Sequence, residues 1–242
     1  IAHQKELYSA IKTMQASGPR QRAQTASGVS FGGVPIDGTG GQDTFSQVDY
    51  ALALSAIQQS KAFLSAAVLN KPLATETVEE KLFGQLVKQG SEDSRHKMTQ
   101  DDANTVDLVG MIFRYMLEDP NLHDSVKTML SHLHTPYLKL ALIDATFLDD
   151  HQHKARVLLN TMAEIGGKWV KKDSDRTVLP KIKAIVETVL KGFVDDDSIF
   201  EQLLDDLLRF KENLEKRSQM VEKRNMESQQ GLEKLEISKQ RA

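Results

Sequence analysis

The sequence predicts an all-α fold that ends in a long C-terminal helix. Apolar residues recur at three- and four-residue steps through most of the chain, as Val106, Val109, Ile112 and Phe113 illustrate. Glycine and proline signals separate these stripes, and no segment alternates between apolar and polar residues for long. Successive short helices of this kind predict either an irregular multi-helix bundle or a HEAT-like helical stack.

The chain divides into segments of different character. Residues 1–15 carry the stripe of an amphipathic N-terminal helix, and residues 16–43 hold half of the chain's 14 glycines. Such a glycine-rich segment buries too little apolar surface to offset the entropy of ordering, so we expect a flexible linker without strands. Residues 44–196 form the predicted helical core domain, and residues 197–242 form one long helix.

Turn signals predict where the core helices begin and end. Asp119-Pro120 should end one helix, because the residue before a proline disfavours helical geometry. Thr135-Pro136 is typical of an N-cap followed by the first helical residue. Gly166-Gly167 should stop the helix that precedes it, since glycine commonly follows a helix C-terminus.

The C-terminal helix carries an apolar residue at every seventh position. This stripe and its first companions predict an interaction helix made of Phe200, Leu203, Leu207, Phe210, Leu214 and Val221. The positions three residues after each stripe residue are the companion positions. They are apolar at Leu203 and Phe210 but polar at Arg217 and Arg224, so the stripe is one-sided beyond Leu214. A seven-residue spacing predicts pairing with another helix, and a coiled coil is one form that the pairing could take.

The composition argues against several classes of partner. A net charge of −3 over 242 residues is too small to favour nucleic acid or an anionic membrane. The chain has no cysteine, which excludes disulfides and thiolate metal sites. It has no run of about 18 apolar residues, so we expect no membrane span and a cytoplasmic protein. Because the sequence starts at Ile1, we interpret it as a fragment of a longer protein.

Residues 107–169 combine helical stripes and turn signals in a specific order. The pattern consists of Asp107, Leu108, Ile112, Phe113, Leu117, Glu118, Asp119, Leu133, Pro136, Leu138, Lys139, Ala141, Asp144, Phe147, His153, Ala155, Arg156, Leu158 and Leu159. It resembles a bacterial family known as domain of unknown function 1631, which often has proline where this chain has Lys154. The resemblance implies a helical module of longer proteins. Some relatives carry a thymidine phosphorylase label, and many continue into a region reminiscent of barrels that bind cyclic dinucleotides.

Asp144, His153 and Arg156 match the family pattern and are the candidate polar cluster. One interpretation is structural, with Arg156 pairing with Asp144 to brace two helices and His153 lying near a helix N-terminus. The alternative is functional, because a basic residue among carboxylates near a helix N-terminus could hold a phosphate. The sequence leaves both interpretations open.

Other groupings of reactive residues do not form a recognisable site. The histidines that invite a metal hypothesis are His123, His132, His134, His151 and His153. Their spacing lacks the pattern that converges three or four ligands on zinc, so we expect histidines at helix ends and on the surface. Adjacent carboxylates fall at expected caps and loops, and the glycines of the linker follow no strand that would build a phosphate loop. We therefore predict no catalytic residue, no metal and no cofactor.

The sequence favours a non-enzymatic helical module of a larger bacterial protein with a scaffold or regulatory role. It would bind a protein partner or self-associate through its terminal helices, because the seven-residue stripe leads into a charged helix. Small-ligand sensing, of a nucleotide or cyclic dinucleotide, is the alternative. An enzyme is a second alternative that rests on the inherited thymidine phosphorylase label alone.

Overall fold

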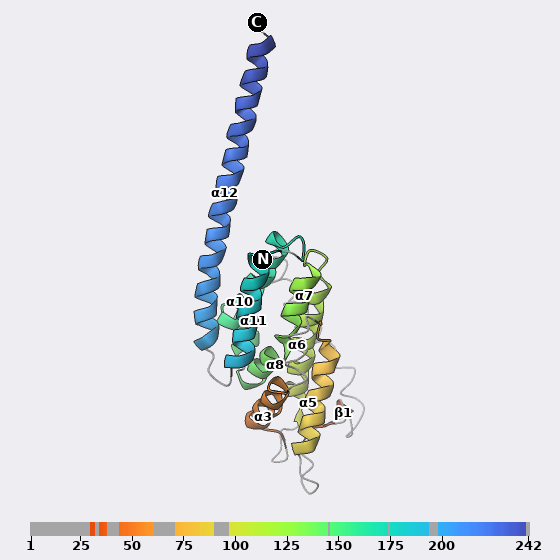
Figure 1. The fold of residues 1–242 in the computed structure, drawn as a ribbon. Coiled ribbons are helices and arrows are strands. Elements are labelled where there is room, and N and C mark those ends of the chain that lie inside the picture. Colours follow the sequence, from red (N-terminus) through yellow and green to blue (C-terminus); the bar gives the residue numbers. More distant parts are fainter. Residues whose placement is uncertain are drawn as a thin grey trace.

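The computed structural model describes residues 30–31, 34–37, 44–60, 71–89, 97–144, 146–173, 175–193 and 198–240, with side chains described between residues 44 and 230 of these ranges. The described part is predominantly helical, which confirms the predicted all-α class (Figure 1). The expected N-terminal helix, residues 1–15, and most of the expected linker lie outside the described residues.

The core is built around one buried helix. α8 (His134–Ile143) is buried at every residue from His134 to Leu142, because its sequence is apolar on almost every side. α3 (Gln47–Gln58) and α6 (Gln100–Glu118) pack against it, and α5 (Thr75–Gln89) packs against α3 and α6. A central helix that other helices cover on several sides is typical of an irregular helical bundle.

The remaining helices complete the bundle and lead to its long C-terminal extension. α7 (Asp124–Ser131) packs on α11 (Val178–Gly192), and the short α9 (Thr146–Asp149) follows α8. α10 (Lys154–Trp169) lies against both α11 and α12 (Ser198–Gln240). α12 continues far past the bundle as a single helix (Figure 1). None of the helices in the described ranges has the length and apolar character that a membrane crossing requires.

Two of the predicted helix boundaries differ from the structure, and one agrees. α6 ends at Glu118 with Asp119 as its C-cap, as predicted. α8 begins at His134 rather than after a Thr135 cap. α10 runs through Gly166-Gly167 to Trp169, because Gly166 allows close packing: a Cβ there would lie 2.6 Å from a methyl carbon of Val126 on α7.

Short strands occur where the sequence predicted only a linker. β1 (Ser30–Phe31) pairs antiparallel with β2 (Val34–Asp37), and β2 pairs parallel with β3 (Met98–Thr99). β3 leads directly into α6, whose N-cap Thr99 accepts a hydrogen bond from the backbone of Asp102. The backbone pairing ties part of the glycine-rich segment to the beginning of α6, and period-two alternation cannot reveal strands this short.

Candidate functional site

Asp144 occupies the junction between α8 and α9. As the C-cap residue of α8, it directs one carboxylate oxygen, Oδ1, at the start of α9, where it accepts hydrogen bonds from the Thr146 amide at 2.8 Å and the Thr146 hydroxyl at 2.7 Å. Its other oxygen, Oδ2, lies 3.1 Å from Nε2 of His153. Partial burial acts to raise the pKa of Asp144, but the bonds from Thr146 and His153 outweigh it and hold the pKa below its usual value.

His153 is the N-cap of α10 and uses both ring nitrogens. Nδ1 accepts a hydrogen bond from the Ala155 amide at 3.2 Å, so the proton of the neutral ring is on Nε2, which donates to Asp144. The ring is buried and meets Phe147 edge-on, with ring centroids 5.4 Å apart. The Asp144–His153 pair therefore joins the start of α9 to the start of α10, and its polar atoms serve helix capping.

Arg156 lies in the first turn of α10, close to this pair but with a different contact from the one predicted. Its Nη1 donates to the backbone carbonyl of Leu148 at 3.4 Å, and the side-chain partner of Asp144 is His153. The structure thus brings Asp144, His153 and Arg156 to one corner of the bundle. The polar side chains at this corner cap helix ends, which is the role expected of residues that hold two helices together.

The histidines grouped by the sequence occupy separate places in the structure. His123 caps α7 through Nδ1, and His132 is the C-cap residue of the same helix. His132 and His134 lie at helix ends, as expected, but both are buried rather than on the surface. Burial lowers the pKa of His134 to about 3, and its ring packs against Phe113 with centroids 4.9 Å apart. It is a neutral core side chain at ordinary pH.

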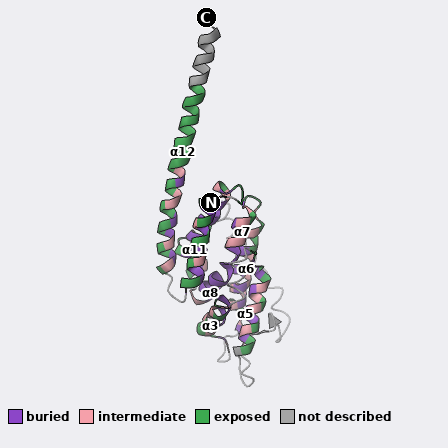
Figure 2. Ribbon diagram, in the orientation of Figure 1, coloured by how far each residue is buried: buried purple, intermediate pink, exposed green. Residues whose placement is uncertain are grey.

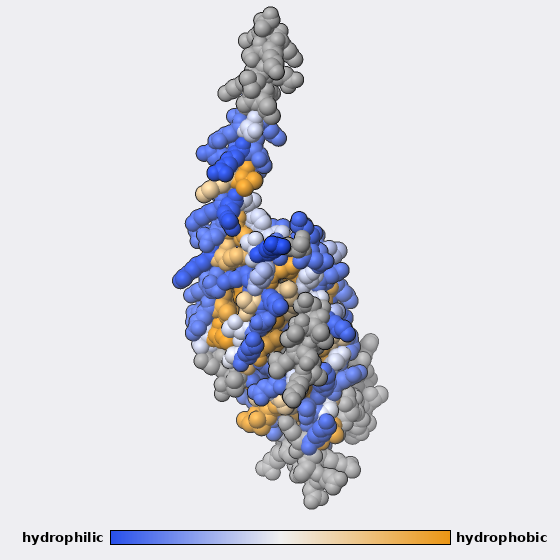
Figure 3. Space-filling view, in the orientation of Figure 1, coloured by the Kyte–Doolittle hydropathy of each residue, from blue (hydrophilic) through white to orange (hydrophobic). Residues whose placement is uncertain are grey.

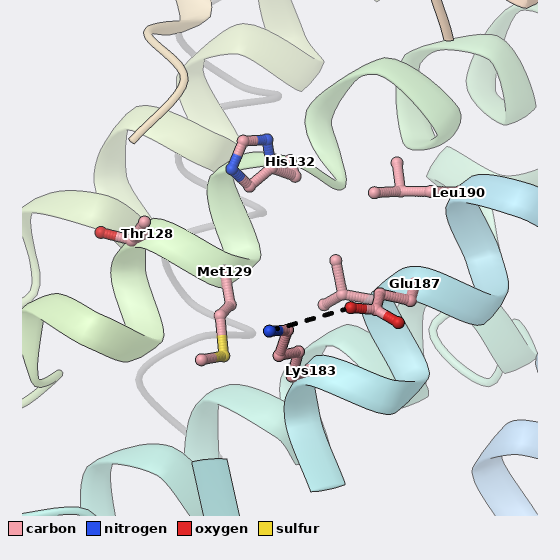
Figure 4. A pocket seen from close by; sticks show the side chains of 7 residues that line it. Thr128, Met129, His132, Lys183, Glu187 and Leu190 are labelled. Atoms are coloured by element: carbon pink, nitrogen blue, oxygen red, sulfur yellow. Dashed lines mark ion pairs between the residues drawn. The ribbon is translucent and has the colours of Figure 1, made fainter. Parts of the chain in front are cut away.

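Figure 4 shows a small hollow between α7 and α11. Its walls include Met129, Leu190 and the Lys183–Glu187 ion pair, whose charged atoms lie 4.0 Å apart. His132 also contributes to the lining, and burial lowers its pKa. The hollow is too small for a nucleotide, and its charged groups are already paired.

Glu79 is a perturbed group that the sequence did not single out. It is half-buried, and its carboxylate lies so close to Gly110 of α6 that a larger residue at position 110 would require the Glu79 side chain to move. Burial raises its pKa to about 7; nearby Arg114 acts in the opposite direction, and Asp107 adds to the rise. No spacing rule identifies such a residue, because the perturbation arises from the approach of two helices.

The first half of the predicted interaction helix faces the protein's own core. Phe200 and Leu207 are fully buried, and Leu214 is almost so. Phe200 lies edge-on to Tyr137 of α8, with ring centroids 5.6 Å apart, while Leu203 and Phe210 are partly buried against the same core. In this chain these residues pack on the bundle, and the expectation that they bind a partner stays a prediction. We call residues 198–215 of α12 the docked half.

Ion pairs flank this apolar contact along its length. They join α12 to α10 and α11 through Lys154–Glu201 at 3.5 Å, Lys211–Glu164 at 2.7 Å, Lys168–Glu215 at 3.6 Å and Lys181–Asp206 at 2.5 Å. Individually, such surface pairs contribute little stability. Distributed along the buried stripe, they fix the position of the docked half on α10 and α11.

The second half of α12 has a different environment. Every residue from 216 to 230 is exposed, as the change to green along α12 shows (Figure 2). Met220, Val221 and Met226 have relative exposures of 62%, 57% and 58%, and apolar residues interrupt the mainly hydrophilic surface of this segment (Figure 3). We call residues 216–240 the distal arm. Of the predicted interaction residues, only Val221 lies on the arm.

The fold and this arrangement define a class: an all-α domain whose last helix completes the core and then extends away from it. The family described as "Protein of unknown function (DUF1631) 2nd domain" matches residues 44–196, and the chain belongs to this family. No curated protein and no solved structure matches the chain. The family match ends before α12, although the docked half contributes Phe200 and Leu207 to the same core.

Proposed function

We propose that this domain is a helical protein-interaction module that presents the distal arm of α12 to a helix of a protein partner. The observation that carries this proposal is the change along a single helix. The stripe that is buried at Leu207 and Leu214 continues onto the arm at Val221, which is 57% exposed. The docked half sets the direction of the arm, because a continuous helix transmits orientation.

The physical chemistry of isolated helices supports this proposal. Most helical stability in proteins comes from packing one face against other structure. Residues 216–230 are all exposed, so they lack such packing against the described part of the chain, and Lys223–Glu227, at 4.0 Å, is a local ion pair within this segment. Pairs of this kind contribute only about 0.3–0.5 kcal/mol each, so a partner helix would add stability that the arm lacks.

The ligand-sensing alternative receives less support from the described geometry. Asp144 and His153 would have to give up their hydrogen bonds to Thr146 and Ala155 to bind a nucleotide. That exchange would expose two helix starts whose backbone amides need partners. We therefore place the functional surface on α12 rather than at this corner.

A site-specific photo-crosslinker tests the proposal in cells that make the natural protein. A crosslinker at Val221 should capture a protein neighbour, because this position continues the buried stripe. Met220 supplies the matched control: it is adjacent and equally exposed, but it lies about 100° away around the helix. Crosslinks from neither position, or equal crosslinks from both, would overturn the proposal.

A further inference from the structure

Glu79 places a carboxylate at the contact between α5 and α6, which lie side by side in the bundle (Figure 1). A Cβ added to Gly110 of α6 would lie 2.4 Å from Oε1 of Glu79, so the glycine leaves room for the carboxylate against the backbone of α6. Gly110 lies in the middle of α6, where helix amides already donate to carbonyls four residues earlier. This backbone therefore offers an ionised carboxylate little of the hydrogen bonding that water provides.

The neighbours of Glu79 on its own helix are apolar. Val78, Leu82 and Phe83 are buried in the core. Residues three and four apart are adjacent on a helix surface, so Glu79 lies beside Leu82 and Phe83 at the edge of the apolar contact. A charge at this edge is held next to side chains that exclude water, and this desolvation disfavours ionisation.

The charged groups that act on Glu79 offset its burial only in part. Arg114 of α6 favours the ionised form, but it is paired with Glu76 at 3.6 Å, and both side chains of that pair are exposed to screening by solvent. Asp107 of α6 and Glu76 of α5 are themselves acidic and disfavour a further negative charge. The balance raises the pKa of Glu79 to about 7.

The other elements packed on α5 are α3, α8 and β2. Their titratable residues are Asp49 and Tyr50 of α3, His134, Tyr137 and Lys139 of α8, and Asp37 of β2, whose side chain lies outside the described residues. The groups that act on Glu79 belong to α5 and α6. A response to pH at Glu79 is therefore a property of the contact between these two helices.

We propose that Glu79 is a proton-dependent contact that controls how firmly α5 is held on α6 near neutral pH. The protonated carboxyl group fits against Gly110 without a charge to desolvate. After ionisation, repulsion from Asp107 and Glu76 favours states in which α5 moves away from α6 and the carboxylate reaches water. This contact lies apart from the surface of the proposed function, since it joins α5 to α6 and not to α12.

The closed contact binds the proton of Glu79 more tightly than an open state does. The pKa of a glutamate in the open state is about 4.5, compared with about 7 for Glu79 in the closed state. Glu79 therefore favours closure fully below pH 4.5, and this effect is lost as the pH rises from 4.5 to above 7. With these two pKa values, ionisation of Glu79 should increase the opening equilibrium of α5 about tenfold between pH 6 and pH 8.

Two glycine substitutions test the geometry of the contact. Gly110→Ala places a methyl group where the Glu79 carboxylate lies and should displace it into water, so the pKa of Glu79, followed by carbon-13 NMR of the side chain, should fall toward 4.5. Gly84→Ala on α5 is the matched control, because a Cβ there meets no neighbouring atom within 4 Å, and it should leave the pKa of Glu79 unchanged. A pKa near 4.5 in the natural chain, or an unchanged pKa in Gly110→Ala, would overturn the proposal.

Hydrogen exchange of the α5 amides measures the consequence for the helix. Glu79→Gln keeps the shape of the side chain and removes its charge. Protection of the α5 amides in this variant, divided by their protection in the natural chain, should rise about tenfold from pH 6 to pH 8. The titration of His134 is common to both chains and cancels in this ratio.

Glu80→Gln supplies the control for charge, since position 80 is adjacent and exposed. Its protection ratio should not vary with pH. A constant ratio for Glu79→Gln, or an equal rise for both variants, would show that the Glu79 contact does not control α5.

Discussion

The docked half and the distal arm of α12 share one sequence rule and differ in nearly everything else. Both carry an apolar residue at every seventh position, yet Leu207 is fully buried and Val221 is 57% exposed. The companion positions distinguish them: Leu203 and Phe210 widen the buried stripe. Beyond Leu214 the companions are arginines. A seven-residue spacing therefore marks one face of a helix, and the width of the stripe indicates whether the core covers that face.

Truncation should separate the two halves most strongly. A chain that ends after Asp196, the end of the family match, loses Phe200, Leu204 and Leu207 from the core. Burial of each such side chain contributes about 1.5–3 kcal/mol, a large share of a typical total of about 5–15 kcal/mol. We expect this truncated chain to show no cooperative unfolding transition in urea when unfolding is monitored by circular dichroism. A chain that ends after Lys216 should keep the cooperative transition. Loss of the transition in both chains would contradict the boundary between the docked half and the distal arm.

Point substitutions should give the next largest contrast. Leu207→Ala should lower the free energy of unfolding by about 2–5 kcal/mol, because it leaves a cavity between α12 and the bundle. The matched change Val221→Ala should alter it by less than about 0.5 kcal/mol, as is usual for exposed positions. Urea titrations of both variants against the natural chain, at the same protein concentration, provide the comparison. Similar losses at the two positions would mean that the arm is also part of the core.

Acid should weaken the core through His134 and leave the arm unaffected. Its pKa in the folded state is about 3, below the unfolded value of about 6.5, so the unfolded chain binds more protons between these values. The stabilisation from the neutral ring is complete above pH 6.5 and is lost as the pH falls toward 3. Between pH 7.5 and 5, the loss should be about 2 kcal/mol.

The variant His134→Leu isolates this effect from other titrations. Glu79, whose raised pKa shifts stability with the opposite sign, is common to both proteins and cancels in the difference. The difference in unfolding free energy between the natural chain and the variant should therefore change by about 2 kcal/mol over this range. The same change should appear in the chain that ends after Lys216. A difference that does not vary with pH would place the His134 ring in a more polar setting.

The ion pairs should give the smallest contrast. Lys211→Ala removes the 2.7 Å contact with Glu164 that joins α12 to α10, and we expect a loss of up to about 1 kcal/mol. Lys216→Ala removes only the local pair with Glu212 on the exposed surface, so the expected loss is about 0.3–0.5 kcal/mol. Thermal unfolding at low salt should show the larger loss for Lys211→Ala, and both losses should shrink at high salt as the charges are screened. Equal losses for the two variants would contradict this contrast.

Local rules predicted the helical class and part of the boundaries. Helical spacing correctly indicated the core helices, and Asp119-Pro120 correctly marked the end of α6, because both depend on neighbouring residues. Gly166-Gly167 failed as a stop signal, since Gly166 allows α7 to approach α10. The pairing of β2 with β3 joins residues far apart in the sequence, which no local spacing reveals.

The candidate site shows the same division between local and tertiary information. The sequence grouped Asp144, His153 and Arg156 and placed His153 near a helix N-terminus, where it caps α10. One interpretation of the sequence paired Asp144 with Arg156, whereas its partner in the structure is His153, because the turn through α9 that brings the two together is tertiary. Likewise, spacing identified the stripe of α12 but not the side on which the bundle lies.

Hydrogen exchange along α12 of the natural chain tests the central claim most directly. Amides in the docked half should exchange only through global unfolding, while amides of residues 217–230 should exchange much faster through local opening. Uniform protection along α12 would contradict the division of α12 into a structural half and an interaction arm.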